Sequence, residues 1–237
     1  MFVKKLSIVI PAYNEEKTVR AVVTRVLAAD IGKISKEVIV VNDGSTDGTA
    51  REVRKIADKR VRLIDKRVNE GKGAAIRDGM KKISGEVMVI QDADLEYNPE
   101  EYMKLLGPIL DGKADVVYGS RFMGGEPHRV LYFWHMVGNT IQTFISDALT
   151  NMNLTDMETC YKMMTAEVAK KITLEEKRFG MEPEITAKIA KLGVRVYEVG
   201  ISYSGRSYAE GKKIGWRDGM RALWVMVKYN LISNRSD

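Results

Sequence analysis

Short apolar runs alternate with amphipathic segments in the first half of the chain, and this alternation restricts the fold more than any other feature of the sequence. The runs are rich in β-branched residues, and most are apolar on both faces, as in a sheet that is covered on both sides. They lie at residues 6–10, 38–41, 61–64, 87–90 and 115–119, and helical patterns at residues 15–29, 47–58, 73–83 and 99–110 separate them. The alternation predicts an α/β fold with a mostly parallel central sheet flanked by helices.

The second half continues without a linker, an internal repeat or a low-complexity stretch. Apolar residues follow a helical spacing over residues 130–149 and 214–231, and residues 194–203 alternate like a strand. A chain of 237 residues that is 45% hydrophobic can bury one large core. We therefore expect a single domain over residues 1–237, whose second half carries amphipathic helices.

Composition narrows the classes of ligand and site. The 38 basic and 32 acidic residues give a net charge of +6, which suits an anionic ligand or a membrane surface, and we expect no nucleic-acid partner. The single cysteine, Cys160, excludes an internal disulfide, and the two histidines, His128 and His135, leave little material for a His-rich metal site. No run reaches the roughly 18 apolar residues of a membrane span. The N-terminal apolar run breaks at Pro11, unlike a signal peptide, so we expect a cytoplasmic protein.

Polar clusters follow four of the five predicted strands. They begin at Pro11 (Pro-Ala-Tyr-Asn-Glu), Asn42 (Asn-Asp-Gly-Ser), Gln91 (Gln-Asp-Ala-Asp) and Gly119 (Gly-Ser-Arg). Ligands of open parallel sheets bind at the carboxyl ends of the strands, which meet at one edge. The sequence therefore predicts one binding site at that edge, built from these four clusters.

Asp92 and Asp94 stand one residue apart where the fourth predicted strand ends. A strand end that turns into a loop can bring such a pair onto one hard cation, and oxygen ligands without histidine or thiolate favour Mg²⁺ or Mn²⁺. The alternative is structural, with Asp94 and Asn98 capping a helix that begins near Pro99. An isolated Asp-x-Asp pair favours capping, but the three neighbouring clusters favour the metal site.

Asp43 ends the second predicted strand, where a carboxylate can accept hydrogen bonds from the ribose or base of a nucleotide. Gly71 and Gly73 open the third predicted helix, a position where backbone amides can bind phosphate. The surrounding sequence lacks the spacing of a P-loop and the third glycine of a dinucleotide fingerprint. Close packing of this helix against the sheet explains the two glycines at least as well.

Three arginines stand where phosphate groups would need them. Arg121 follows the fifth predicted strand, Arg129 lies further along, and Arg206 belongs to a loop rich in glycine and tyrosine that also contains Lys212. Guanidinium groups bind phosphate through paired hydrogen bonds, and lysines bind it as point charges. Two phosphates, one on a donor and one on an acceptor, would account for these residues. The alternative for Lys212 is a solvated loop.

At this point the motifs resemble a known family. The set comprises IVIPAYNEE (residues 8–16), VNDGSTDGT (41–49), NEGKG (69–73), DADL (92–95) and GSRF (119–122), and it resembles glycosyltransferase family 2 of the GT-A fold. Residues 201–214 resemble the branch of polyprenyl-phosphate (dolichyl-phosphate) hexose synthases. The resemblance implies a nucleotide-sugar-binding half at residues 1–125 and an acceptor-binding half at residues 126–237.

The resemblance also implies roles for the residues that match the motifs of the family. Those implied to bind the nucleotide sugar are Pro11, Ala12, Tyr13, Glu15, Asp43, Lys72, Asp92, Arg206 and Lys212. Those implied to bind the metal are Asp92, Asp94 and Glu96, and those implied to bind the acceptor phosphate are Arg121 and Arg129. Catalysis is expected to depend on Asp92, Asp94, Arg121 and Arg206.

The implied reaction is an inverting transfer of a hexose to a polyprenyl phosphate, with Mg²⁺ or Mn²⁺ as cofactor and GDP-mannose favoured over UDP-glucose as donor. The acceptor phosphate is already anionic and needs no strong general base. Relatives often have Gly-Phe-Arg where this chain has Cys160-Tyr161-Lys162, so sugar and acceptor specificity stay open. Two alternatives remain. One is transfer to a soluble acceptor with Asp156 as general base, and the other is a nucleotidyltransferase, although residues 11–16 are not its glycine-rich loop.

The amphipathic segments carry Trp134, Trp216 and Trp224, with basic residues near them. This composition is typical of helices in a lipid interface, although apolar stripes also pack in cores and between subunits. Because the implied acceptor is a lipid, we expect peripheral association with the cytoplasmic face of a membrane. The sequence does not predict the oligomeric state.

Overall fold

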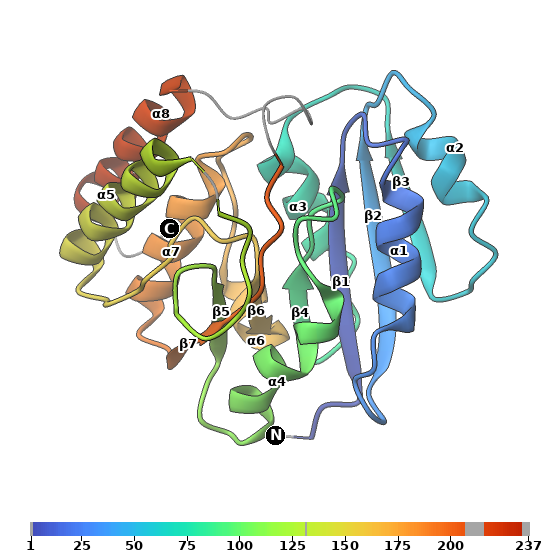
Figure 1. Cartoon of the computed structure of the whole chain (residues 1–237), viewed down its shortest axis with the longest axis horizontal. Coiled ribbons are helices and arrows are strands. Elements are labelled where there is room, and N and C mark those ends of the chain that lie inside the picture. Colours follow the sequence, from blue (N-terminus) through green and yellow to red (C-terminus); the bar gives the residue numbers. More distant parts are fainter. Residues whose placement is uncertain (1, 131, 207–215, 234–237) are drawn as a thin grey trace.

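The computed structural model describes residues 2–130, 132–206 and 216–233, and its strands form one seven-stranded sheet (Figure 1). The strands are β1 (Lys5–Ala12), β2 (Ser35–Asp43), β3 (Val61–Lys66), β4 (Val87–Ile90), β5 (Val116–Ser120), β6 (Lys162–Thr165) and β7 (Val196–Gly200). Their order across the sheet is β3-β2-β1-β4-β6-β5-β7. All neighbouring pairs are parallel except the two made by β6, which is antiparallel to β4 and to β5. The prediction of a mostly parallel sheet is confirmed.

Helices connect the strands and cover the sheet. They are α1 (Val19–Ala28), α2 (Thr49–Arg54), α3 (Lys72–Met80), the 3-10 turn η1 (Pro99–Glu101), α4 (Tyr102–Leu110), α5 (Phe133–Thr150), α6 (Ala166–Lys171), α7 (Met181–Leu192), α8 (Trp216–Val227) and the π-helical turn η3 (Lys228–Ile232). Figure 1 shows α1 in front of the sheet and α3 behind it. Helices α5, α7 and α8 pack on one another beside the half of the sheet that contains β5 and β7.

The central strands are buried on both faces, which explains why the sequence shows continuous apolar runs there. Ile8 and Val9 of β1, and Met88 and Val89 of β4, point to opposite faces of the sheet and have no exposed surface. Helices on both sides of a parallel sheet require apolar side chains at every position of such strands rather than at alternate ones. The five strands predicted for the first half therefore match β1–β5.

Strand β6 and helices α6 and α7 were not predicted. β6 reads Lys-Met-Met-Thr and begins with a lysine, Lys162, that has no exposed surface. A fully buried lysine needs a charged partner, and its ammonium group lies 2.6 Å from Oε2 of Glu182 on α7. Because β6 runs against its neighbours, the segment that precedes it lies at the carboxyl ends of β4 and β5. The topology thus adds a further segment to the predicted edge.

The apolar stripe predicted over residues 130–149 faces away from the protein. Trp134 and Phe144 are 77% and 73% exposed, whereas the buried residues of α5 are Thr143 and Ser146. The neighbouring α8 and η3 likewise expose Met220, Trp224, Val227 and Leu231. None of the helices in the described ranges has the length and apolar character needed to cross a membrane.

Candidate functional site

The predicted clusters follow the carboxyl ends of β1, β2, β4 and β5, and Arg206 connects two of them. Arg206 follows β7, and its guanidinium group lies among three carboxylates from two other segments. Nη2 is 2.7 Å from Oδ2 of Asp94, Nε is 3.0 Å from Oε1 of Glu96, and Nη1 is 3.7 Å from Oε1 of Glu15. The backbone N–H of Arg206 also donates to Glu96. One cation from the second half of the chain therefore joins the loops that follow β1 and β4.

The loop after β4 is shaped to bring two carboxylates together. Leu95 adopts a left-handed conformation with φ of 66°, which costs a residue other than glycine about 1–2 kcal/mol. This turn lets Asp94 and Glu96, on either side of it, bind the same guanidinium group. Burial, and then repulsion by Asp92 and Glu96, raises the pKa of Asp94 to about 7 in spite of Arg206. The loop thus holds more negative charge than one arginine neutralises.

Asp92 belongs to a chain of alternating charges that is partly exposed at Asp92 and Lys72 and buried at Glu182 and Lys162. Its Oδ1 is 2.7 Å from the ammonium group of Lys72, the first residue of α3, and that group is 3.5 Å from Oε1 of Glu182. Glu182 in turn pairs with Lys162 of β6. Burial lowers the pKa of Lys72, but its acidic neighbours, Asp92 first, outweigh burial and raise it well above the ordinary value. Lys72 therefore supports Asp92 as a permanent positive charge.

The carboxylates fit a hard divalent cation by their chemistry. Asp92, Asp94 and Glu96 offer only oxygen ligands. Burial and then repulsion by Asp92 and Glu96 raise the pKa of Asp94, and a bound cation would relieve that repulsion. Within the described residues no group of three or more acidic, histidine or cysteine side chains is already arranged to hold an ion. Asp94 and Glu96 bind Arg206 instead, and Asp92 binds Lys72. Metal binding by these residues stays a prediction.

Asp43 is committed to the neighbouring loop. Its carboxylate accepts hydrogen bonds from the backbone N–H groups of Glu70 and Gly71, and it lies 2.8 Å from the ammonium group of Lys66. Asp43 ends β2, beside Pro11 and Ala12 at the end of β1, and the next residue, Tyr13, is 40% exposed. Four of the residues predicted to bind the nucleotide sugar thus lie at the ends of β1 and β2, namely Pro11, Ala12, Tyr13 and Asp43, and Asp43 shapes the loop over residues 69–71.

Gly71 and Gly73 permit the close approach of another backbone segment, so close packing accounts for both glycines. A Cβ atom on Gly73 would lie 2.0 Å from the carbonyl oxygen of Glu176, and one on Gly71 would lie 2.2 Å from that of Lys177. Gly71 also has φ of 99°. The N–H groups of Gly73 and Ala74 donate to the carbonyl oxygen of Lys177. The start of α3 therefore packs against the segment before α7, and not against the sheet as expected.

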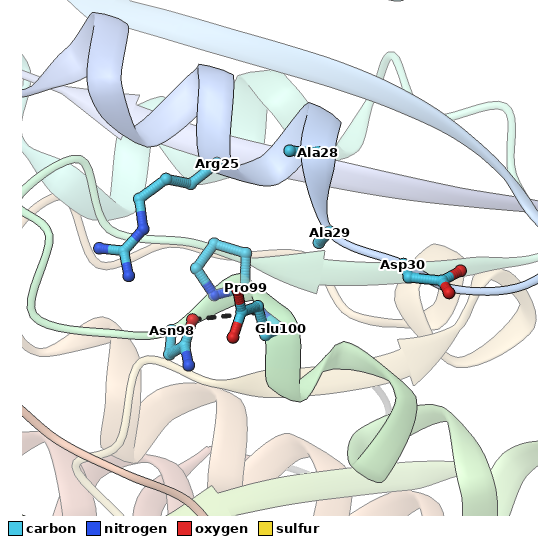
Figure 2. Close-up of a pocket in the computed structure, with 7 residues that line it drawn as sticks. All are labelled: Arg25, Ala28, Ala29, Asp30, Asn98, Pro99 and Glu100. Carbon is cyan, nitrogen blue, oxygen red and sulfur yellow. Dashed lines mark hydrogen bonds between the residues drawn. The ribbon is translucent and has the colours of Figure 1, made fainter.

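The alternative that Asp94 and Asn98 are helix caps holds for Asn98 alone. The side chain of Asn98 accepts from the N–H of Glu100 and caps η1, with Pro99 in its first turn. Asp94 instead accepts from the N–H of Glu96 in its own loop and from Arg206. Figure 2 shows this cap in a pocket of about 400 Å³ between η1 and the end of α1. The pocket contains none of the predicted site residues.

Arg121 forms a buried, two-pronged ion pair with Asp156. Its Nε and Nη2 atoms lie 2.6 and 2.7 Å from the two carboxylate oxygens, and its backbone N–H donates to the same carboxylate. Burial opposes the charge of Arg121, but Asp156 raises the pKa of the guanidinium group well above its ordinary value. Arg129 lies nearby in sequence, is exposed, and donates to the carbonyl oxygen of Gly205. Because both oxygens of Asp156 are engaged, Asp156 is a poor general base.

A groove of about 550 Å³ runs between Arg121 and helix α5. Apolar side chains supply part of its wall, and Arg121, His128 and Asp147 supply charged or titratable groups. The full lining is Arg121, Phe122, His128, Met136, Thr140, Thr143, Phe144, Asp147, Leu154 and Thr155. Phe144 also belongs to the exposed apolar face of α5, so the groove connects Arg121 with that face.

Sequence reasoning missed several residues that hold the site together. Tyr203 donates to Glu96 at 2.6 Å and stacks its ring against the guanidinium group of Arg121 at 5.2 Å, so it links the two ends of the edge. Lys162 and Glu182 support Lys72 from behind. The sequence shows Glu182 only as an acidic residue in the first turn of α7. Its ion-pair partners, Lys72 and Lys162, lie too far away in the chain to be predicted from a local pattern. Lys212 lies outside the described residues.

Comparison with known sequences identifies the family of the chain. A profile described as Glycosyl transferase family 2 matches residues 7–173. The chain is 29% identical over 230 residues to a dolichol-phosphate mannosyltransferase of Pyrococcus furiosus, covering 95% of this chain and 64% of that protein. It is 29% identical over 244 residues to an undecaprenyl-phosphate mannosyltransferase of Micrococcus luteus, covering 94% and 97%. These relatives agree with the resemblance found in the motifs.

Solved structures share the fold. A glucosyl-3-phosphoglycerate synthase from Mycobacterium tuberculosis, in complex with Mn²⁺, UDP and glucosyl-3-phosphoglycerate, superposes with a TM-score of 0.74. The match covers 98% of this chain and 81% of that one at 19% sequence identity. The same synthase has also been solved with Mn²⁺ and UDP-glucose, with a TM-score of 0.74.

Proposed function

The chain belongs to glycosyl transferase family 2, and from this we propose that it transfers a hexose from a nucleotide sugar to a polyprenyl phosphate. The family excludes the nucleotidyltransferase alternative. Two mannosyltransferases named for polyprenyl phosphates resemble the chain over more than nine-tenths of its length, which supports this acceptor class and favours GDP-mannose as donor. A donor with UDP is the second candidate, since the structural relatives bind UDP and UDP-glucose.

The proposal that the acceptor is a polyprenyl phosphate rests on the groove beside Arg121. A polyprenyl phosphate combines one anionic head with a long apolar chain. The groove is lined on one side by the partly exposed Arg121 and leads to the exposed apolar face of α5. Arg129 is proposed as a second contact for the phosphate. Transfer to a soluble hydroxyl would need a general base, and both oxygens of the candidate, Asp156, are held by Arg121.

On the donor side, the chain would bind and orient a charged leaving group. Pro11 and Ala12 end β1, Tyr13 and Glu15 follow it, Asp43 ends β2, and Lys72 begins α3. These six residues are proposed to bind the nucleotide sugar. Arg206 would stabilise the negative charge that develops on the departing diphosphate. Bound Mg²⁺ or Mn²⁺ would supply Lewis-acid stabilisation of that diphosphate, with Asp92, Asp94 and Glu96 as ligands. The acceptor phosphate would attack the anomeric carbon from the opposite face and invert its configuration.

The test is to measure thermal unfolding with GDP, UDP, GDP-mannose and UDP-glucose, each with and without Mn²⁺. A ligand at 100 times its Kd stabilises the folded state by about 2.7 kcal/mol, so the correct nucleotide series raises Tm, and it does so more with Mn²⁺. The nucleotide sugar that binds is then incubated with a polyprenyl phosphate, and the glycolipid is quantified. A folded sample that binds none of the four, or that glycosylates 3-phosphoglycerate in preference to the lipid, contradicts the proposal.

We further propose that the outer face of α5 and α8 lies on a lipid surface, where the acceptor resides. Trp134 and Phe144 of α5 and Trp224 of α8 are all more than half exposed on this face. Replacing Trp134 and Phe144 together with glutamate is expected to reduce co-flotation with anionic vesicles at least tenfold, because it removes apolar area and adds negative charge. The control is Phe2→Glu, which changes an 81% exposed aromatic residue elsewhere. Equal flotation of all three proteins would show that this face does not contact lipid.

A further inference from the structure

Glu158 carries a carboxyl group that has no role in the proposed transfer reaction. Within residues 156–165, it is the one residue that solvent reaches in part, since every other residue of this run is buried. Its Oε1 atom is nonetheless enclosed and has no hydrogen-bond partner among the described residues. A buried polar atom without a partner costs free energy, and such atoms are rare in native proteins, where a functional role or a bound molecule can account for them.

The segment that carries Glu158 spans the gap between the proposed donor and acceptor positions. Asp156 holds Arg121 at the acceptor end, and Oγ1 of Thr159 donates to the carbonyl oxygen of Gly119 at the end of β5. The thiol of Cys160 contacts the carbonyl oxygen of Ile90, at the end of β4 and two positions before Asp92. Glu158 therefore lies between the arginine proposed for the acceptor phosphate and the carboxylates proposed for the donor diphosphate.

Lys162 fixes the backbone on both sides of Glu158 without neutralising its side chain. The ammonium group of Lys162 donates to the carbonyl oxygens of Met157, at 2.9 Å, and of Thr159, and it pairs with Glu182. Arg121 is paired with Asp156 in the same way. Burial, followed by repulsion from Glu182, accordingly raises the pKa of Glu158 to about 7. The backbone around Glu158 is held in place, and Lys162 and Arg121, which are paired with other acids, only partly offset the rise in the pKa of Glu158.

We propose that Glu158 binds hydroxyl groups of the hexose being transferred and so helps to determine which sugar is accepted. This inference rests on the proposed function. A carboxylate repels the diphosphate and the acceptor phosphate on either side of it, so the ligand that it favours is the neutral part of the substrate between them. Sugar hydroxyls are neutral groups, and a carboxylate readily accepts hydrogen bonds from them. A site built around such a bond discriminates strongly against a sugar that lacks the hydroxyl.

The experiment compares a nucleotide with its sugar conjugate in wild type, Glu158→Gln and Glu158→Ala. Affinities for GDP, GDP-mannose, UDP and UDP-glucose are measured by calorimetry in the presence of Mn²⁺. Glu158→Ala is expected to bind the free nucleotide like wild type and to lose roughly 10- to 100-fold in affinity for the nucleotide sugar, the usual loss for one hydrogen bond to a charged group. Glu158→Gln, which keeps one acceptor oxygen, is expected to lose less.

The control is Glu198→Gln. Glu198 accepts hydrogen bonds from the backbone N–H groups of Thr155 and Asp156, so this variant loosens the same segment without touching the carboxyl group of Glu158. If Glu198→Gln reproduces the loss, or if Glu158→Ala weakens nucleotide and nucleotide sugar equally or neither, the inference is wrong. A series of deoxy sugars adds a second readout, because Glu158→Ala must abolish the penalty for one missing hydroxyl. If wild type binds no nucleotide at all, the proposed function itself fails.

Discussion

Replacing Asp94 with asparagine is expected to lower the rate of sugar transfer by about 10³-fold or more while the protein stays folded. Asp94 is proposed as a metal ligand, and an amide binds a divalent cation much more weakly than a carboxylate does. Glu96 and Glu15 still hold Arg206 in the variant, so the loop keeps its main connection to the segment after β7. The measurement is the initial rate of glycolipid formation at saturating donor and Mn²⁺.

Stability measured against pH provides an independent check of the same residue. The pKa of Asp94 is raised from 3.8 to about 7 in the folded protein, so the folded state holds a proton that the unfolded state has lost between these values. The free energy of unfolding of wild type therefore contains a contribution that falls as pH rises through this window. Asp94→Asn lacks that contribution, and its stability relative to wild type should increase from pH 4 to pH 7.

The matched control for Asp94→Asn is Glu100→Gln, which removes an exposed carboxylate a few residues along the same connection. It is expected to leave the rate of sugar transfer unchanged. Asp94→Asn with more than a tenth of wild-type activity would overturn the metal assignment. A decrease in relative stability with rising pH would overturn the description of Asp94 as a carboxylate held against repulsion.

Arg121→Gln is expected to destabilise the protein by about 3–5 kcal/mol and to abolish transfer. Asp156 has no exposed surface, and removal of one partner of a buried ion pair leaves an uncompensated buried charge. Stability is measured by chemical denaturation at pH 7. Because loss of folding alone would explain loss of activity, the single variant does not test the proposed contact with the acceptor phosphate.

The double variant Arg121→Gln with Asp156→Asn separates the two effects. It removes both charges of the pair and is expected to recover most of the lost stability, since two neutral amides can hydrogen-bond where the ions did. Its activity should stay low if Arg121 binds the acceptor phosphate. Arg129→Gln, at an exposed position, should keep its stability and raise the KM for the lipid. A stable double variant with wild-type activity would exclude Arg121 as an acceptor ligand.

Local patterns predicted most of the sheet but not its antiparallel strand. Strands β1–β5 are buried on both faces, and such strands leave apolar runs that a reader of the sequence can find. Strand β6 begins with Lys162, whose burial depends on Glu182, 20 residues further along the chain. A short-range pattern contains no information about that partner. The same limit explains why Glu158 was missed, since its position depends on how the segment before β6 crosses the edge.

The sequence by itself determined strands β1–β5, the edge that collects the polar clusters, and the family that the motifs resemble. These follow from periodicity and from residues close together in the chain, where backbone geometry dictates the outcome. Only the tertiary structure decided that Arg206 binds Asp94, 112 positions away, that Asp156 is engaged by Arg121, and that the apolar stripe of α5 faces outward. Periodicity shows that a helix has an apolar face, but the elements packed around it decide where that face points. Likewise, an ion pair between distant segments forms only when those segments pack together.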